Sequence, residues 1–325
     1  MRHWTIYTFI ALCLGAAGPS PSRAAQVSSQ LRRIGVLSPF INPGSLFFET
    51  LQEELAKLGY AEGKNLVYVH RAAERFDELS KLAVELVQLK VDVIVTEGPQ
   101  GVRAAQNATR SIPIVMGDVG DAVNQGFVAS LARPGGNVTG LSSLNAELSG
   151  KRLELLKEAV PKLSRFAVLR EAVGDAYPLR TIESAAQAMG LKAIVFQVRE
   201  ADEVPSAFAA MTSSKVGAFQ LLTGSLFVSR LHSITELATQ TKLPGIFSDA
   251  RFVRSGGLIS YGPDVLALYK RAAIFVDKIF KGAKPSDLAV EQPTAFELTI
   301  NLKTANALGI KIPPGLLSRA DQILK

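Results

Sequence analysis

The sequence is poor in the residues that form redox, disulfide and metal centres. Its 325 residues include one cysteine, Cys13, and three histidines. A single cysteine excludes an intrachain disulfide framework and a multi-cysteine metal site. His70 and His232 each stand without a second histidine nearby, so neither is expected to bind a metal. We therefore expect no metal and no cofactor.

Motifs of nucleophilic catalysis and phosphate binding are also missing. The sequence has no Gly-x-Ser-x-Gly elbow, no P-loop and no Gly-x-Gly-x-x-Gly fingerprint. The glycine pairs at 135–136 and 256–257 lack the lysine and the spacing that phosphate binding requires. With no nucleophile and base in a recognisable arrangement, we do not expect an enzyme. A secreted α/β enzyme stays open as an alternative that turnover of a bound ligand would support.

Neither charge nor hydrophobicity is concentrated in long runs beyond residue 25. The formal net charge is +7, and the charged residues are interspersed along the chain. A nucleic-acid-binding face is therefore not expected. No apolar stretch after residue 25 approaches the roughly 20 residues that a membrane-spanning helix needs.

The N-terminus has the parts of a secretory signal peptide. Arg2 precedes an apolar run over residues 5–18, and small residues follow it. We expect cleavage after Ala24, which removes residues 1–24 and leaves a periplasmic protein. A membrane anchor is the alternative, but prolines and serines at 19–22 interrupt the apolar run.

From Arg33 onward, short strand-like runs alternate with amphipathic helical stretches. Apolar residues at helical spacing, such as Leu51, Leu55 and Leu58, predict helices between these runs. The alternation as far as Met116 predicts a parallel sheet covered by helices on both faces. The predicted strands cover 34–37, 65–69, 91–95 and 112–116, and the predicted helices cover 44–58, 76–89 and 99–108.

The same alternation starts again after the turn-rich segment 133–137 and predicts a second parallel sheet. The tail adds one strand, 257–261, and one long helix, 265–281, which are too few for a third domain. We expect both to return to the first sheet. The predicted fold class is α/β, with two Rossmann-like lobes built on parallel sheets. The expected bounds are 31–138 plus 250–288 for lobe I and 139–249 plus 289–325 for lobe II.

Four stretches of the chain are specific enough to indicate relatives. They are LGYAEGKNL at 58–66, SLARPGGNVTGLS at 130–142, KRLELLK at 151–157 and VEQPT at 290–294. These blocks resemble the substrate-binding proteins of ABC transporters of the tryptophan/tyrosine transport type, over a region from about Arg33 to Lys325. The resemblance implies the type I periplasmic binding protein fold, in which three hinge crossings join the lobes. We expect the crossings near 138–142, 248–251 and 287–291.

The resemblance also implies a function, the solute-binding component of an ABC importer. Such a protein binds a small polar ligand between its lobes and closes by hinge motion. An aromatic amino acid is one candidate ligand. The expected partner is an ABC permease in the inner membrane, and we expect a monomer with no nucleic-acid partner. The alternative is a ligand-sensing module for a receptor kinase, which shares the fold and differs in its partner.

Candidate ligand-binding residues follow from the position of such a cleft, at the carboxyl ends of the parallel strands. Gly98 and Pro99 suit a helix start that faces a ligand, although an ordinary strand-to-helix turn has the same residues. Asp118 and Asp249 are candidates to bind an ammonium group, with a cap or turn as the alternative for each. The other candidates are hydroxyl, aromatic and basic residues in the same loops, namely Ser38, Phe40, Arg170, Thr223, Ser225 and Tyr261.

Overall fold

The computed structural model describes residues 31–40, 45–173 and 177–325. The predicted signal peptide, residues 1–24, lies outside the described residues. In the described part of the chain, no helix is both long and apolar enough to cross a membrane.

The first sheet has five parallel strands in the order β2-β1-β3-β4-β5. Apolar residues of its inner strands are fully buried, as the predicted covering of both faces requires. The strands are β1 (Arg32–Ser38), β2 (Leu66–Ala72), β3 (Val93–Thr96), β4 (Ile114–Val119) and β5 (Val138–Ser142). Its helices are α1 (Leu46–Lys57), α2 (Leu79–Gln88) and α3 (Gly98–Ala108), with the short 3₁₀ helix η1 (Phe76–Glu78).

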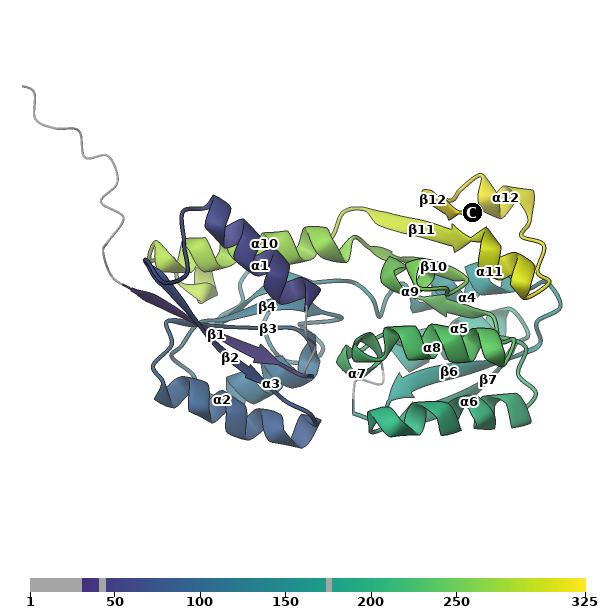
Figure 1. Ribbon diagram of the computed structural model, residues 1–325, viewed down its shortest axis with the longest axis horizontal. Coiled ribbons are helices and arrows are strands. Elements are labelled where there is room, and N and C mark those ends of the chain that lie inside the picture. Colours follow the sequence, from purple (N-terminus) through teal and green to yellow (C-terminus); the bar gives the residue numbers. More distant parts are fainter. Residues whose placement is uncertain (1–30, 41–44, 174–176) are drawn as a thin grey trace, which may run out of the picture. The chain divides into compact units, whose positions relative to one another are not determined.

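A helix from late in the chain completes the first lobe. Helix α10 (Val265–Phe280) begins at Asp264, whose side chain accepts hydrogen bonds from the backbone of residues 266 and 267. Its buried face packs against α1, β4 and β5. Tyr269 and Phe275 of α10 share one core cluster with Phe47 of α1. Figure 1 shows α10 beside α1, although more than 200 residues of chain separate them.

The second sheet has seven strands in the order β12-β11-β10-β9-β8-β6-β7. Only the β10–β11 pair is antiparallel among the described strands. The strands are β6 (Arg165–Glu171), β7 (Lys192–Val198), β8 (Phe219–Leu221), β9 (Gly245–Phe247), β10 (Ile259–Pro263), β11 (Phe296–Asn301) and β12 (Gln322–Leu324). The helical segments of this lobe are α4 (Ser149–Ala159), α5 (Tyr177–Ala188), η2 (Ala201–Glu203), α6 (Val204–Ser213), α7 (Ser225–Ser229), α8 (Leu231–Gln240), α9 (Ala250–Arg254), α11 (Leu302–Ala307) and α12 (Pro314–Leu317).

The strand predicted at 257–261 is in the second sheet, and the expectation that it returns to the first sheet is wrong. Strand β10 pairs with β9 and β11. Only the short helix α9 and a turn separate β9 from β10, so the chain is still beside β9 when β10 begins. Alternation of strands and helices predicts that a strand exists, but it does not say which of two sheets the strand joins.

The three crossings between the sheets also lie later in the chain than expected. Residues 138–142 form β5, so the first crossing is 143–148. The second crossing is at Asp264, between β10 and α10, because residues 248–251 begin α9 within the second lobe. The third follows Glu291, which still forms a bridge to Leu141 of β5. A further short turn, η3 (Pro285–Asp287), precedes it.

Candidate functional site

A cavity of about 90 Å³ lies between residues that follow strands of both sheets. An adjoining cavity of about 120 Å³ shares six of its lining residues. The shared residues are Pro99, Gly120, Asn145, Thr223, Gly224 and Ser248. Because the two volumes share these walls, we treat them as one cleft between the lobes.

The smaller cavity has three carboxyl groups and one guanidinium group among its described lining residues. Asp249 begins α9 and is bound by Arg251, with 2.6 Å between the carboxylate and the Nη2 atom. Glu97 accepts a hydrogen bond of 2.7 Å from the Tyr269 hydroxyl. Burial raises the pKa of Glu97, while the Tyr269 hydrogen bond and the charge of Arg251 oppose the rise. The acidic groups therefore outnumber the basic one, which favours a cationic ligand group.

Asp118 is the carboxyl group of this set that has an unsatisfied atom. Its Oδ1 is buried and has no hydrogen-bond partner among the described residues. Asp118 lies where the pairing of β4 with β5 shifts register, between Met116 and Val119. Burial raises the pKa of Asp118, against the effects of a hydrogen bond from Ser143 and of the charge of Arg251. A buried acceptor without a partner costs free energy, and a ligand donor would satisfy it.

Two helix starts from opposite lobes approach each other closely at the cleft. Gly98 begins α3 with a φ of +73°, and Pro99 takes the first turn, where its missing N–H costs no hydrogen bond. A Cβ atom on Gly98 would lie 2.6 Å from the Oγ of Ser225, at the start of α7. The backbone conformation favours glycine, and a Cβ atom at this position would force the Ser225 hydroxyl to move.

A second interlobe contact lies in the adjoining cavity. The Gln100 Nε2 of α3 donates a hydrogen bond of 3.1 Å to Glu171, at the end of β6. Glu171 also accepts a bond of 2.8 Å from the backbone N–H of Leu226. Burial is the main cause that raises the pKa of Glu171 to about 7, since these hydrogen bonds only partly offset it.

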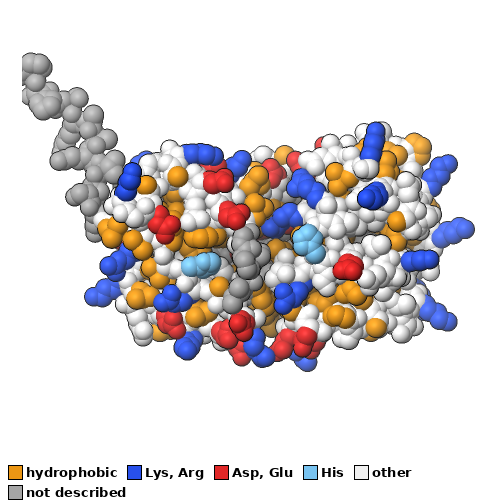
Figure 2. Space-filling model, in the orientation of Figure 1, with side chains coloured by type: hydrophobic (Ala, Val, Ile, Leu, Met, Phe, Trp, Pro, Cys, Tyr) orange, Lys and Arg blue, Asp and Glu red, His pale blue; other side chains and the backbone are white. Residues whose placement is uncertain are grey.

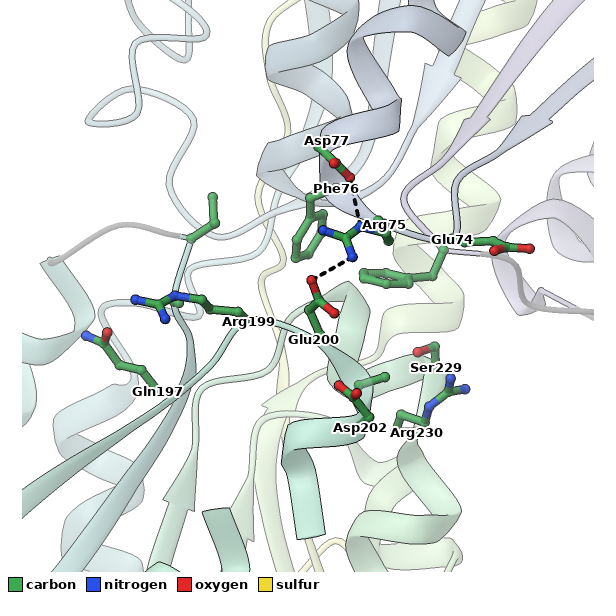
Figure 3. A pocket seen from close by; sticks show the side chains of 14 residues that line it. Glu74, Arg75, Phe76, Asp77, Gln197, Arg199, Glu200, Asp202, Ser229 and Arg230 are labelled. Carbon is green, nitrogen blue, oxygen red and sulfur yellow. Dashed lines mark hydrogen bonds and ion pairs between the residues drawn. The ribbon is translucent and has the colours of Figure 1, made fainter. Parts of the chain in front are cut away.

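A larger open cavity of about 1000 Å³ lies at the mouth of the cleft (Figure 3). Arg75 forms an ion pair of 2.8 Å with Glu200 of the other lobe, and both side chains are largely exposed. Phe40 meets Phe76 edge to face, with ring centroids 4.8 Å apart. Both rings pack against the apolar core of the second lobe. On the face shown in Figure 2, acidic and basic side chains are interspersed.

The structure brings together six of the ten residues that the sequence suggested. Gly98, Pro99, Asp118, Thr223, Ser225 and Asp249 all line the 90 Å³ cavity. Arg170 lines the adjoining cavity, and Phe40 lines the mouth.

The other two candidates, Ser38 and Tyr261, line none of these three cavities. The Ser38 hydroxyl is 2.8 Å from His70 Nε2, on the neighbouring strand. The Tyr261 ring lies near Phe296 of β11, which is a neighbour within the second sheet.

Sequence reasoning missed several residues that line the cleft, among them Glu97, Arg251, Tyr269, Asn145 and Glu171. Glu97 directly precedes Gly98 and shares its loop, so its position was a usable signal. Arg251 follows the predicted Asp249 by two residues, which is a similar signal. Glu171 directly follows the predicted Arg170 at the end of β6, which is again a similar signal. Tyr269 and Asn145 gave no such signal, because their places depend on how α10 and the first crossing pack.

The two sheets, their order and the three crossings define the type I periplasmic binding protein fold. Solute-binding proteins at 14% identity share that fold, with TM-scores of 0.58 and 0.55. The chain belongs to the family described as ABC transporter substrate binding protein, whose model matches residues 34–324. It is therefore a substrate-binding protein of an ABC transporter, with a small-molecule ligand and a permease partner. This family is a non-enzymatic class and is extracellular or periplasmic.

Three relatives show how similar this chain is to known proteins. A tyrosine-binding protein of Clostridioides difficile (strain R20291) is 28% identical over 268 residues, which cover 82% of this chain and 76% of that protein. The crystal structure of an ABC domain from Streptococcus pneumonia in complex with L-Trp is 27% identical, with a TM-score of 0.82. It covers 91% of this chain and 100% of that one. A conserved domain protein from Vibrio cholerae is 28% identical, with a TM-score of 0.83 over 90% of this chain and 100% of that one.

Proposed function

We propose that the cleft binds an aromatic α-amino acid and that the two lobes close around it. The observation that carries the proposal is the buried, unpartnered Oδ1 of Asp118 inside an acidic cavity. An α-ammonium group would donate a hydrogen bond to this oxygen and place a positive charge beside the carboxylate. The nearby pair of Asp249 and Arg251 is already satisfied, so the ammonium is directed to Asp118.

The ligand carboxylate belongs at the start of α3. No side chain caps this helix, since its N-cap residue Glu97 makes no capping hydrogen bond. The first N–H groups of an uncapped helix attract a carboxylate, and the positive end of the helix dipole adds to this. The flexible backbone at Gly98 lets the ligand come close.

The aromatic side chain of the ligand belongs in the adjoining cavity. Its walls include Pro99, Ala146 and Leu222, which offer apolar contact, together with the polar residues Arg152 and Glu171. A ring with an apolar face and a polar edge suits such a pocket. That the relatives are named for tyrosine binding and for a complex with L-Trp supports this choice of ligand.

The proposed cycle is binding, closure and delivery. A ligand that touches Asp118 of lobe I and Thr223 or Ser225 of lobe II favours the closed arrangement, because it has more contacts there than in an open one. We propose that the closed monomer docks on an ABC permease in the inner membrane. We further propose that residues 1–24 direct export to the periplasm and are removed by cleavage.

A thermal-shift screen of the mature chain tests the ligand class. We expect L-tyrosine or L-tryptophan to raise the melting temperature, while sugars and purines leave it unchanged. For each compound that raises the melting temperature, calorimetry then gives a dissociation constant. A shift with a sugar or a purine and none with an aromatic amino acid would overturn the proposal.

A further inference from the structure

Arg152 is a buried guanidinium group whose hydrogen-bond partners are all uncharged. It lies in the first turn of α4 and is only 1% exposed. It donates to the backbone carbonyls of Tyr261 at 2.6 Å and Asn145 at 2.7 Å, and to Asn145 Oδ1 at 2.7 Å. Burial lowers its pKa to about 9, so it stays protonated at neutral pH. Holding such a charge away from water is costly, and its three hydrogen bonds together with the nearby charge of Glu147 offset part of that cost.

The residues that accept from Arg152 lie at two of the three crossings between the sheets. Asn145 belongs to the first crossing, residues 143–148. Tyr261 lies in β10, three residues before the second crossing at Asp264. One side chain therefore holds the first crossing against the strand that leads into the second.

The hydrogen bonds continue from Asn145 towards Asp118, and their directions are fixed. Because a guanidinium group only donates, Asn145 turns its Oδ1 to Arg152 and its Nδ2 to the Ser143 hydroxyl, 3.0 Å away. The hydroxyl accepts there, so its own hydrogen is left for β4, where the Val119 carbonyl lies 3.4 Å away. The same single hydrogen can turn to the Asp118 carboxylate, where it favours the charged form and so opposes the rise of the Asp118 pKa.

The end of this chain of hydrogen bonds is the irregular part of β4 that presents Asp118. The Ser143 backbone N–H donates to the Val119 carbonyl at 2.8 Å, which fixes β4 just after Asp118. Gly140 permits the shifted register beside it, since a Cβ there would lie 2.3 Å from the Met116 carbonyl. Bulges of this kind aim a side chain at a site, and here the side chain is Asp118.

We propose that Arg152 is a positioning residue that links the two crossings, through Asn145 and Ser143, to the irregular part of β4 that carries Asp118. The inference rests on the proposed function only in taking Asp118 as the acceptor of the ligand ammonium. A ligand that binds the positioned carboxylate favours the arrangement of crossings that positions it. Arg152, which also lines the adjoining cavity, thereby couples the cleft to the hinge.

Titration of Asp118 in the ligand-free protein tests this link. The probe is the ¹³Cγ signal of labelled aspartate, and the Asp118 resonance is assigned from its loss in Asp118→Asn. We expect Ser143→Ala to raise the pKa of Asp118, since it removes the hydroxyl that favours the charged form. Arg152→Met is expected to cause a rise of similar size. The double variant with Ser143→Ala and Arg152→Met should raise the pKa of Asp118 no more than Ser143→Ala alone, because both changes interrupt the same series of hydrogen bonds.

Two further variants test whether Arg152 acts on Asp118 by positioning it, rather than through its positive charge or through the overall stability of the protein. Arg152→Lys keeps the charge but cannot reach both Asn145 and Tyr261, so it is expected to raise the pKa of Asp118 as well. The matched control is Thr139→Val, which removes a buried 2.7 Å hydrogen bond from Thr139 to the Leu288 carbonyl, near the third crossing. This control is expected to lower the melting temperature and to leave the Asp118 titration unchanged.

Three results would overturn the inference: an Asp118 titration that Ser143→Ala does not move, shifts that add in the double variant, or a shift of equal size in Thr139→Val. If Arg152→Met does not fold, Ser143→Ala and Arg152→Lys decide the question. Calorimetry with L-tyrosine at pH 7 is the second readout, with an expected loss of about threefold to tenfold in Ser143→Ala. A wild-type protein that binds no amino acid would refute the proposed function, while the ligand-free titration would still judge the link.

Discussion

Substituting Gly98 by alanine is expected to weaken ligand binding by blocking the closest approach of the two lobes. The new Cβ would lie 2.6 Å from Ser225 Oγ across the cleft, nearer than real Cβ contacts come. Overpacking of this kind costs about 1 to 3 kcal/mol, which corresponds to a roughly 5- to 150-fold loss of affinity. Because the Ser225 hydroxyl can rotate away, we expect the lower end of that range. The conflict exists only when the lobes are together, so it opposes closure.

The substitution also strains the backbone, and this effect has to be separated from the effect of the contact with Ser225. Gly98 has a φ of +73°, where a residue with a Cβ is destabilised by about 1 to 2 kcal/mol. The matched control is Gly59→Ala, because Gly59 has a φ of +92° and nothing within 4 Å of its new Cβ. Both variants are expected to lower the melting temperature. Only Gly98→Ala is expected to lower the affinity for L-tyrosine.

Calorimetry of Gly98→Ala, Ser225→Ala and the double variant completes the test. Since Ser225→Ala removes the clashing oxygen, the loss of affinity caused by Gly98→Ala should largely disappear in that background. An affinity of Gly98→Ala equal to that of the wild type would refute the reasoning, because the two helix starts would then not meet in the liganded state.

Two further predictions concern the buried carboxyl groups. Asp118→Asn is expected to lower the affinity for L-tyrosine by roughly 30-fold or more at pH 8, because a buried charge partner of the ammonium is lost. Calorimetry across pH should show wild-type affinity falling as the pH drops through the raised pKa of Asp118, and a flat profile in the variant. Glu171→Gln is expected to stabilise the protein by up to about 3 kcal/mol above pH 7. Its pKa rises from 4.5 to about 7 on folding, so the wild type binds more protons when folded and loses stability as pH rises across that window. Urea unfolding at pH 5 and pH 8 measures the stability of the wild type and of Glu171→Gln. An equal pH dependence of stability in the two proteins would contradict the raised pKa of Glu171.

Much of the site was predictable because it follows strand ends. Gly98, Asp118 and Asp249 each lie within two residues of the end of a buried strand, and parallel strands bring their carboxyl ends to one edge. Ser38 occupies an equivalent place at the end of β1, yet its hydroxyl faces His70 of β2. A strand end fixes where a residue lies, while its neighbours decide what its side chain meets.

Residues placed by tertiary packing were not predictable from the sequence. Tyr269 reaches Glu97 only because α10 packs on the first lobe, since the two residues are 172 positions apart in the sequence. Arg152 lies in a recognisable family block, but its partners depend on how the first crossing meets β10. The misplacement of β10 has the same origin, since local patterns specify strands and not the sheets that they join.

Calorimetric titration of the wild-type mature chain with L-tyrosine and two of its analogues tests the central claim most directly. One analogue, tyramine, lacks the carboxylate, and the other, 3-(4-hydroxyphenyl)propionate, lacks the ammonium group. We predict that L-tyrosine binds one molecule per chain and that each analogue binds at least tenfold more weakly, with the greater loss for the analogue without the ammonium. Equal binding of L-tyrosine and 3-(4-hydroxyphenyl)propionate would contradict the assignment of Asp118 as the acceptor of the ligand ammonium.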